Sequence, residues 1–153
     1  MALQFVLLLG AADLLADATY EGGRSVVGPF LALLGASGVA VGVLSGLGEM
    51  VGYGLRLGSG YLSDRLARPW AIALFGYALN LLAVPALALA GTWQVAAALM
   101  VAERAGRGLR APARDLMLSH AASRIGFGWA FGLHEALDQA GAVAGPLLVA
   151  LVL

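Results

Sequence analysis

The chain has 153 residues, of which 61% are hydrophobic and 12% charged, and its formal net charge at pH 7 is zero. Soluble domains are usually about 45–50% apolar and about 25% charged, so this composition excludes an ordinary soluble domain and indicates a polytopic membrane protein. All nine basic residues are arginine and they form no run, which argues against a nucleic-acid partner. The chain contains no cysteine, which excludes a disulfide framework and a thiolate metal site.

A membrane-spanning helix needs about 20 predominantly apolar residues, and five segments of the chain meet this requirement. We expect an all-α bundle forming a single transmembrane domain over residues 1–153, with spans at about 3–34, 37–62, 70–90, 93–111 and 127–153. The first span is long enough to tilt or bend, and the fourth is expected to stop at Pro112. The connections near 35–38 and 91–93 are very short, so the helices that they join should be antiparallel.

Arginine placement predicts the orientation in the membrane. The two short connections contain no lysine or arginine. The connection between the second and third spans carries Arg65 and Arg68, and the one between the fourth and fifth carries Arg114 and Arg124. The positive-inside rule therefore places the arginine-bearing connections and the N-terminus in the cytoplasm.

Ionisable residues inside the first span suggest a function, because such groups are costly in a membrane. Asp13, Asp17 and Glu21 recur every four residues and so share one helix face, while Arg24 is placed to pair with Glu21. Repulsion among acids this close favours a protonated form for at least one of them, as a proton carrier requires. The alternative, which the sequence favours equally, is that Asp13 or Asp17 merely pairs with an arginine of another helix.

The second and fourth spans also carry charges. Glu103 precedes Arg107 by four residues, the favourable order for a helical ion pair, so Arg104 needs an acid from another helix, because a buried unpaired guanidinium is too costly. The candidate acids are Asp13, Asp17 and Glu49. We therefore expect an interior polar seam, either a charge network or a wet cavity.

Two further patterns leave alternatives open. Glycines at four-residue spacing along the second span, beginning with Gly38, Gly42 and Gly46, indicate tight helix packing or a helix that slides. On the fifth span, His134-Glu135-x-x-Asp138 weakly resembles the zincin pattern His-Glu-x-x-His. Because the second histidine is missing, a proton-titrating or packing role is favoured over an intramembrane metalloprotease, and no metal or cofactor is assigned.

The polar stretch after the second span carries a resemblance to a known family. Gly60-x-Leu62-x-Asp64-Arg65-x-Ala67-Arg68 resembles the loop signature Gly-x-Leu-x-Asp-Arg-x-Gly-Arg of the major facilitator superfamily, with Ala67 in place of a glycine. The resemblance implies a tight cytoplasmic loop between helices two and three, in which the charged residues form a gate. The gate residues that it implies are Gly60, Asp64, Arg65 and Arg68.

Two more motifs follow in the order of that family. Arg104-Ala105-Gly106-Arg107-Gly108 resembles the fourth-helix motif Arg-x-x-Gln-Gly, which implies that Arg104 is a buried arginine tied to proton coupling. On the fifth helix the spacing Gly-x8-Gly-x3-Gly-Pro resembles the motif of antiporters. The residues that carry this spacing are Gly132, Gly141, Gly145 and Pro146.

Together the motifs resemble the N-terminal half of a major facilitator transporter, helices one to five. The family binds its substrate between two six-helix halves. The resemblance implies a non-enzymatic, proton-coupled exporter of small molecules, or a half or fragment of one, in a bacterial or archaeal plasma membrane. A second half or a homo-oligomeric partner would complete it, and a non-transporting membrane subunit is the alternative. The expected coupling residues are Asp13, Asp17, Glu21, Arg24, Glu49, Arg104 and Arg107.

Overall fold

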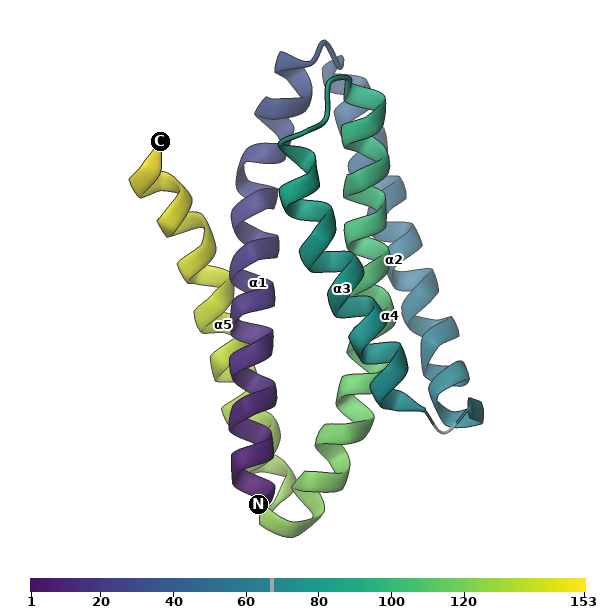
Figure 1. Ribbon diagram of the computed structural model, residues 1–153, viewed down its shortest axis with the longest axis vertical. Helices are drawn as coiled ribbons and strands as arrows, with labels where there is room; N and C mark the ends of the chain where they lie inside the picture. Colours follow the sequence, from purple (N-terminus) through teal and green to yellow (C-terminus); the bar gives the residue numbers. More distant parts are fainter. Residues whose placement is uncertain (67) are drawn as a thin grey trace. The chain divides into compact units, whose positions relative to one another are not determined.

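A computed structural model of the chain describes residues 1–66 and 68–153, with all their side chains except those of Asp64 and Leu66. The described residues form five α-helices and no strand, which confirms the predicted all-α fold class (Figure 1). The helices are α1 (Ala2–Leu33), α2 (Gly38–Leu66), α3 (Pro69–Leu87), α4 (Trp93–Ile125) and α5 (Phe127–Val152).

Four of these helices are long and apolar enough to cross a membrane, namely α1, α2 over Gly38–Ser63, α3 and α5. The chain is therefore a multi-pass membrane protein. Although α4 has 33 residues, it does not meet the same criterion, because Glu103, Arg104, Arg107 and Arg110 interrupt its apolar sequence. The fifth span stays a prediction.

Glycine sets two of the turns between helices. Gly35 has a φ of 91° and Gly126 a φ of 95°, a left-handed conformation that residues with a Cβ rarely adopt. Beyond Gly35, the Ser37 hydroxyl accepts a hydrogen bond from the Ala40 N–H at 3.2 Å and caps the start of α2. These features give the short connection after α1 that the sequence predicted, and they leave only Gly126 between the end of α4 and the start of α5.

The stretch expected as a loop after the second span is mostly helical. The structure continues α2 to Leu66, so Gly60 and Arg65 belong to the helix and the expected loop at these residues was wrong. Arg65 lies in the last turn, where a cation interacts favourably with the helix dipole. Pro69 stands at the start of α3, where its missing N–H costs no hydrogen bond.

The expected stop of the fourth helix at Pro112 was also wrong, since α4 continues to Ile125. Proline has no N–H, so the Gly108 carbonyl loses its usual partner one turn back along the helix. The Ser59 hydroxyl of α2 donates a hydrogen bond to that carbonyl at 3.1 Å. Because a neighbouring helix satisfies the orphaned group, the proline is tolerated inside α4.

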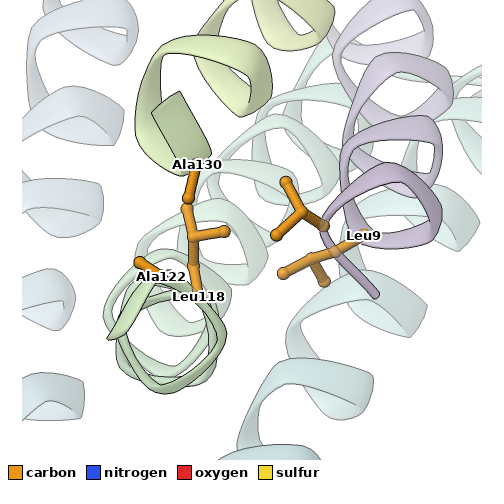
Figure 2. Close-up of a cluster of buried hydrophobic side chains, with 5 residues drawn as sticks. Leu9, Leu118, Ala122 and Ala130 are labelled. Carbon is orange, nitrogen blue, oxygen red and sulfur yellow. The ribbon is translucent and has the colours of Figure 1, made fainter. Parts of the chain in front are cut away.

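The helices group into two compact units. The first comprises Met1–Ser25 and Arg114–Leu153, and the second comprises Val26–Ala113. In the first unit, α1, α4 and α5 each contribute to one apolar cluster, in which Leu9, Leu118, Ala122 and Ala130 face one another (Figure 2). The fifth member of this cluster is Val6.

The second unit has its own apolar core and two close helix crossings. Its core is formed by Leu31, Ala36, Ala90, Ala96 and Met100. At the α3–α4 crossing, a Cβ added to Gly76 would lie 2.7 Å from the Gly106 carbonyl oxygen, and at the α2–α4 crossing Gly108 faces the Gly52 backbone. Of the α2 glycines, Gly48 and Gly52 serve packing, whereas Gly38, Gly42 and Gly46 meet no atom within 4 Å.

Candidate functional site

The first unit contains a buried polar cluster that continues directly from its apolar core. Asp13 follows Leu9 by one turn on the inward face of α1, and Asp17 lies one turn further. Their relative exposures are 0% and 1%, so both carboxyl groups are removed from solvent. A buried carboxylate must be paired and hydrogen-bonded to be tolerated, so its partners define the site.

Asp13 interacts with two other helices of this unit. Its Oδ2 atom lies 2.8 Å from His134 Nε2 on α5 and 3.2 Å from Arg114 Nη1 on α4. The same Nη1 atom lies 3.6 Å from Asp138 Oδ1, while the rest of the guanidinium binds Asp115 Oδ1 at 2.9 Å and 3.0 Å. One arginine therefore bridges carboxyl groups from α1, α4 and α5.

Asp138 also shares a side-chain hydrogen bond with Asp17. A carboxylate has no donor, so two carboxyl groups joined in this way need a proton between them. The cluster thus holds the carboxyl groups of Asp13, Asp17 and Asp138 against one guanidinium and one imidazole. Its composition lets it hold protons as well as ion pairs.

Glu21 and Arg24 occupy a more exposed part of α1. Arg24 Nη1 lies 3.6 Å from Glu21 Oε1, which confirms the pair expected from the sequence, and the guanidinium also lies over the Tyr20 ring at 5.9 Å from its centre. The Arg24 side chain is half exposed. Because exposed pairs contribute about 0–1 kcal/mol, this pair adds little to stability.

In the second unit, Arg104 is buried and pairs with Glu49 of α2, one of the three acids that the sequence offered. Its Nη2 atom lies 3.8 Å from Glu49 Oε1, and its Nη1 atom donates to the Ser45 carbonyl. Gly48 makes room for this side chain, since a Cβ there would lie 2.6 Å from Nη1 and 2.8 Å from Cδ of Arg104. Glycine at that position on α2 therefore sets where the guanidinium lies.

The second buried polar pair of this unit joins α3 to α4. Asn80 Nδ2 donates a hydrogen bond of 2.6 Å to Glu103 Oε1, and both side chains are buried. Arg110, about two turns further along α4, is also buried and stacks on the Tyr77 ring at 4.9 Å. Arg107 is partly exposed between them.

The expected gate motif lies near the end of α2. Arg65 is exposed, and its Nη1 donates to the Tyr61 hydroxyl at 3.0 Å. Arg68 is exposed between α2 and α3, and a Cβ at Gly60 would make only an ordinary contact of 3.7 Å with Pro112. The side chain of Asp64, the acid of the motif, lies outside the described residues.

The glycine motif of α5 divides into two parts. Gly141 and Gly145 contact the α1 backbone at Leu14 and Ala18, and no Cβ would fit at either position without displacing that backbone. Gly132 meets no atom within 4 Å, and Pro146 lies within the helix. The two contact glycines bring α5 close enough to α1 for His134 to reach Asp13.

No metal centre is present in the part of the chain that the structure describes, where no group of three or more His, Cys, Asp or Glu residues could hold an ion. His134 of the weak zincin-like pattern instead directs Nε2 to Asp13.

Arg114 and Asn80 were not among the site residues expected from the sequence. Arg114 had been placed in a connection, although its four-residue spacing to Leu118 and Ala122 already indicated one continuous helix face. Asn80 was overlooked in the third span, where an amide within an otherwise apolar helix is itself a signal.

Comparison with known proteins identifies relatives of this chain. It is 54% identical over 149 residues to an uncharacterized protein of Mycobacterium tuberculosis and, equally, to one of Mycobacterium bovis, matches that cover 97% of this chain and 36% of each relative. It is 29% identical over 143 residues to an uncharacterized MFS-type transporter of Methanocaldococcus jannaschii, covering 94% of this chain and 36% of that protein. No family model and no solved structure matches. The chain thus spans about a third of the length of these relatives.

Proposed function

We propose that this chain is the N-terminal part of a major-facilitator-type secondary transporter that couples movement of a small molecule to protons. Its distant similarity to an MFS-type transporter, together with four helices able to span a membrane, supports the class. The observation that carries proton coupling is the buried cluster around Asp13, where His134 and Arg114 bind the same carboxylate oxygen. Ionisable groups held in this way inside a membrane bundle are typical of proton relays.

The chain covers only 36% of the relatives' length, so on this proposal it works with a second half or with another copy of itself. The substrate then lies between the two halves, as in other transporters built from repeats. The N-terminus faces the cytoplasm, as arginine placement indicates, in a bacterial or archaeal plasma membrane. On this proposal the transporter is an antiporter that exports its substrate, and the support for antiport is the spacing Gly-x8-Gly-x3-Gly-Pro on α5, which resembles the motif of antiporters.

The first experiment measures the mass of the purified protein in mild detergent, corrected for bound detergent. A dimer, or co-purification with a second membrane chain, supports an assembled transporter. A monomer would refute a transporter assembled from copies of this chain and would mean that the chain is a fragment of a longer one.

The second experiment tests coupling in proteoliposomes that hold a preset pH gradient, with an internal pH-sensitive dye, while a panel of small solutes is added. We expect at least one solute to drive proton movement through the wild-type protein. Asp17→Asn should abolish that movement while leaving a folded protein, because it removes a buried proton-sharing carboxyl group. Unchanged flux in this variant would remove Asp17 from the mechanism.

A further inference from the structure

The geometry of the buried cluster in the first unit indicates which of its groups donate hydrogen bonds and which accept them. Asp13 Oδ2 lies 2.8 Å from His134 Nε2 and 3.2 Å from Arg114 Nη1. An Asp13 carboxylate that is paired with Arg114 has no hydrogen to give, so the imidazole is the donor in this contact. The neutral ring therefore carries its hydrogen on Nε2, which leaves Nδ1 as the nitrogen that can accept a proton.

We propose that His134 is a proton-binding residue of the coupling site and that its charge controls the Asp13–Arg114 ion pair. This inference rests on the proposed function and adds to it a residue outside the expected coupling set. A proton from water binds Nδ1, and the resulting imidazolium becomes a second cation beside Asp13 Oδ2. The imidazolium then competes with Arg114 for one carboxylate oxygen.

Arg114 has a second partner ready for that exchange. Its Nη1 atom lies 3.2 Å from Asp13 Oδ2 and 3.6 Å from Asp138 Oδ1. When His134 is protonated, the guanidinium shifts its interaction toward Asp138.

Charges on all three helices of the unit act on this exchange. Asp13 and Asp17 face it from α1, Arg114 and Asp115 from α4, and Asp138 from α5 beside His134 itself. When all the carboxyl groups are ionised, a single guanidinium does not neutralise them, so the cluster carries an excess of negative charge. An imidazolium at His134 reduces that excess in the middle of the unit.

The decisive experiment follows the His134 imidazole by NMR as the pH is changed in the whole chain in detergent micelles. The chain has two histidines, and the exposed His120 is removed by His120→Gln, which leaves a single ring to observe. We expect the His134 signal to titrate with pH. Asp13→Asn should move the midpoint to lower pH by about 1–3 units, because a carboxylate within hydrogen-bonding distance stabilises the imidazolium by that amount.

The matched control is Asp115→Asn, since Asp115 binds the other side of Arg114 and is more exposed. It should move the midpoint by less than half as much. A His134 signal that does not titrate, or an equal shift in Asp13→Asn and Asp115→Asn, would overturn the proposal.

A second measurement covers the case in which Asp13→Asn does not fold. Proton uptake by the purified protein between pH 8 and pH 5 should fall by one proton per chain in His134→Gln, which keeps a donor but has no basic nitrogen. Equal uptake in His134→Gln and the wild type would refute the assignment of His134.

Proteoliposomes separate the two proposals. A wild-type protein that moves no protons with any solute contradicts transport but leaves the titration of His134 to be decided by NMR. A wild-type protein that moves protons, with an unchanged pH dependence in His134→Gln, keeps the transport function and refutes the role of His134.

Discussion

The close crossing of α3 and α4 makes Gly76→Ala a sharp test of how this bundle is held together. A Cβ at residue 76 would lie 2.7 Å from the Gly106 carbonyl oxygen and 2.8 Å from the Arg110 backbone nitrogen, whereas ordinary contacts begin near 3.4 Å. Both clashing atoms belong to the backbone, so no change of rotamer relieves them. The two helices must therefore separate by about 0.7 Å.

Such a separation has a calculable cost. A gap of 0.5–1 Å forfeits roughly a quarter to a half of each dispersion contact along the crossing, and overpacking typically destabilises by about 1–3 kcal/mol. The matched control is Gly54→Ala on α2, where an added Cβ meets no atom within 4 Å. In that open position alanine should stabilise the helix by roughly 0.5–1 kcal/mol.

We therefore expect Gly76→Ala to be less stable than Gly54→Ala by about 2 kcal/mol, which is roughly a 30-fold difference in the ratio of folded to unfolded protein. Equilibrium unfolding in mixed micelles of mild detergent and dodecyl sulfate, followed by circular dichroism, measures this difference. If the two variants unfold at the same dodecyl sulfate fraction, the α3–α4 crossing is not as close as described and the reasoning is refuted.

Two further predictions use the same unfolding assay. Ser59→Ala should lower the free energy of unfolding by about 1 kcal/mol, because it leaves the Gly108 carbonyl without its donor. This loss should be smaller in a protein that also carries Pro112→Ala, which restores a helical N–H to that carbonyl. Strictly additive effects of the two substitutions would contradict the account of the proline. Asn80→Leu should destabilise the protein by about 1–3 kcal/mol, because it leaves Glu103 buried without its amide donor. Adding Glu103→Leu should recover most of that loss. A double variant that is no more stable than Asn80→Leu would disprove the pairing.

The positions of α1, α2, α3 and α5 along the chain could be predicted from the sequence because the signals for them are local. Apolar length identifies a spanning helix wherever its neighbours lie, and the turn after α1 depends on Gly35 and Ser37 themselves. Four-residue spacing also identified the polar face of α1, where Asp13 and Asp17 prove to be buried.

Partner choice could not be predicted in the same way. Periodicity shows which residues share a face but not which helix packs on that face, so Arg104 had three candidate acids in the sequence. The structure pairs it with Glu49 because Gly48, one residue before that acid, leaves space for the guanidinium. The pairing of Arg104 therefore depends on the space that one glycine leaves on α2. The pattern of charges in the sequence carries no information about that space.

The error at Pro112 had the largest consequence for the site. Proline predicts a helix end only when nothing else satisfies the carbonyl that it orphans, and here Ser59, 49 residues earlier in the chain, does so. With α4 continuous, Arg114 becomes the first of a helical series with Leu118 and Ala122, which pack in the apolar cluster of the first unit. Arg114 lies on the same face of α4, so its side chain reaches the polar side chains of α1 that adjoin the cluster, and it binds Asp13.

This dependence suggests why the polar cluster adjoins an apolar one. Leu118 and Ala130 pack with Leu9 beside the charged groups, and those contacts join α1, α4 and α5. Ion pairs in a low-dielectric interior gain enough to offset desolvation only when their geometry is well defined. The packed side chains supply that geometry, so Asp13 can bind an imidazole and a guanidinium at one oxygen.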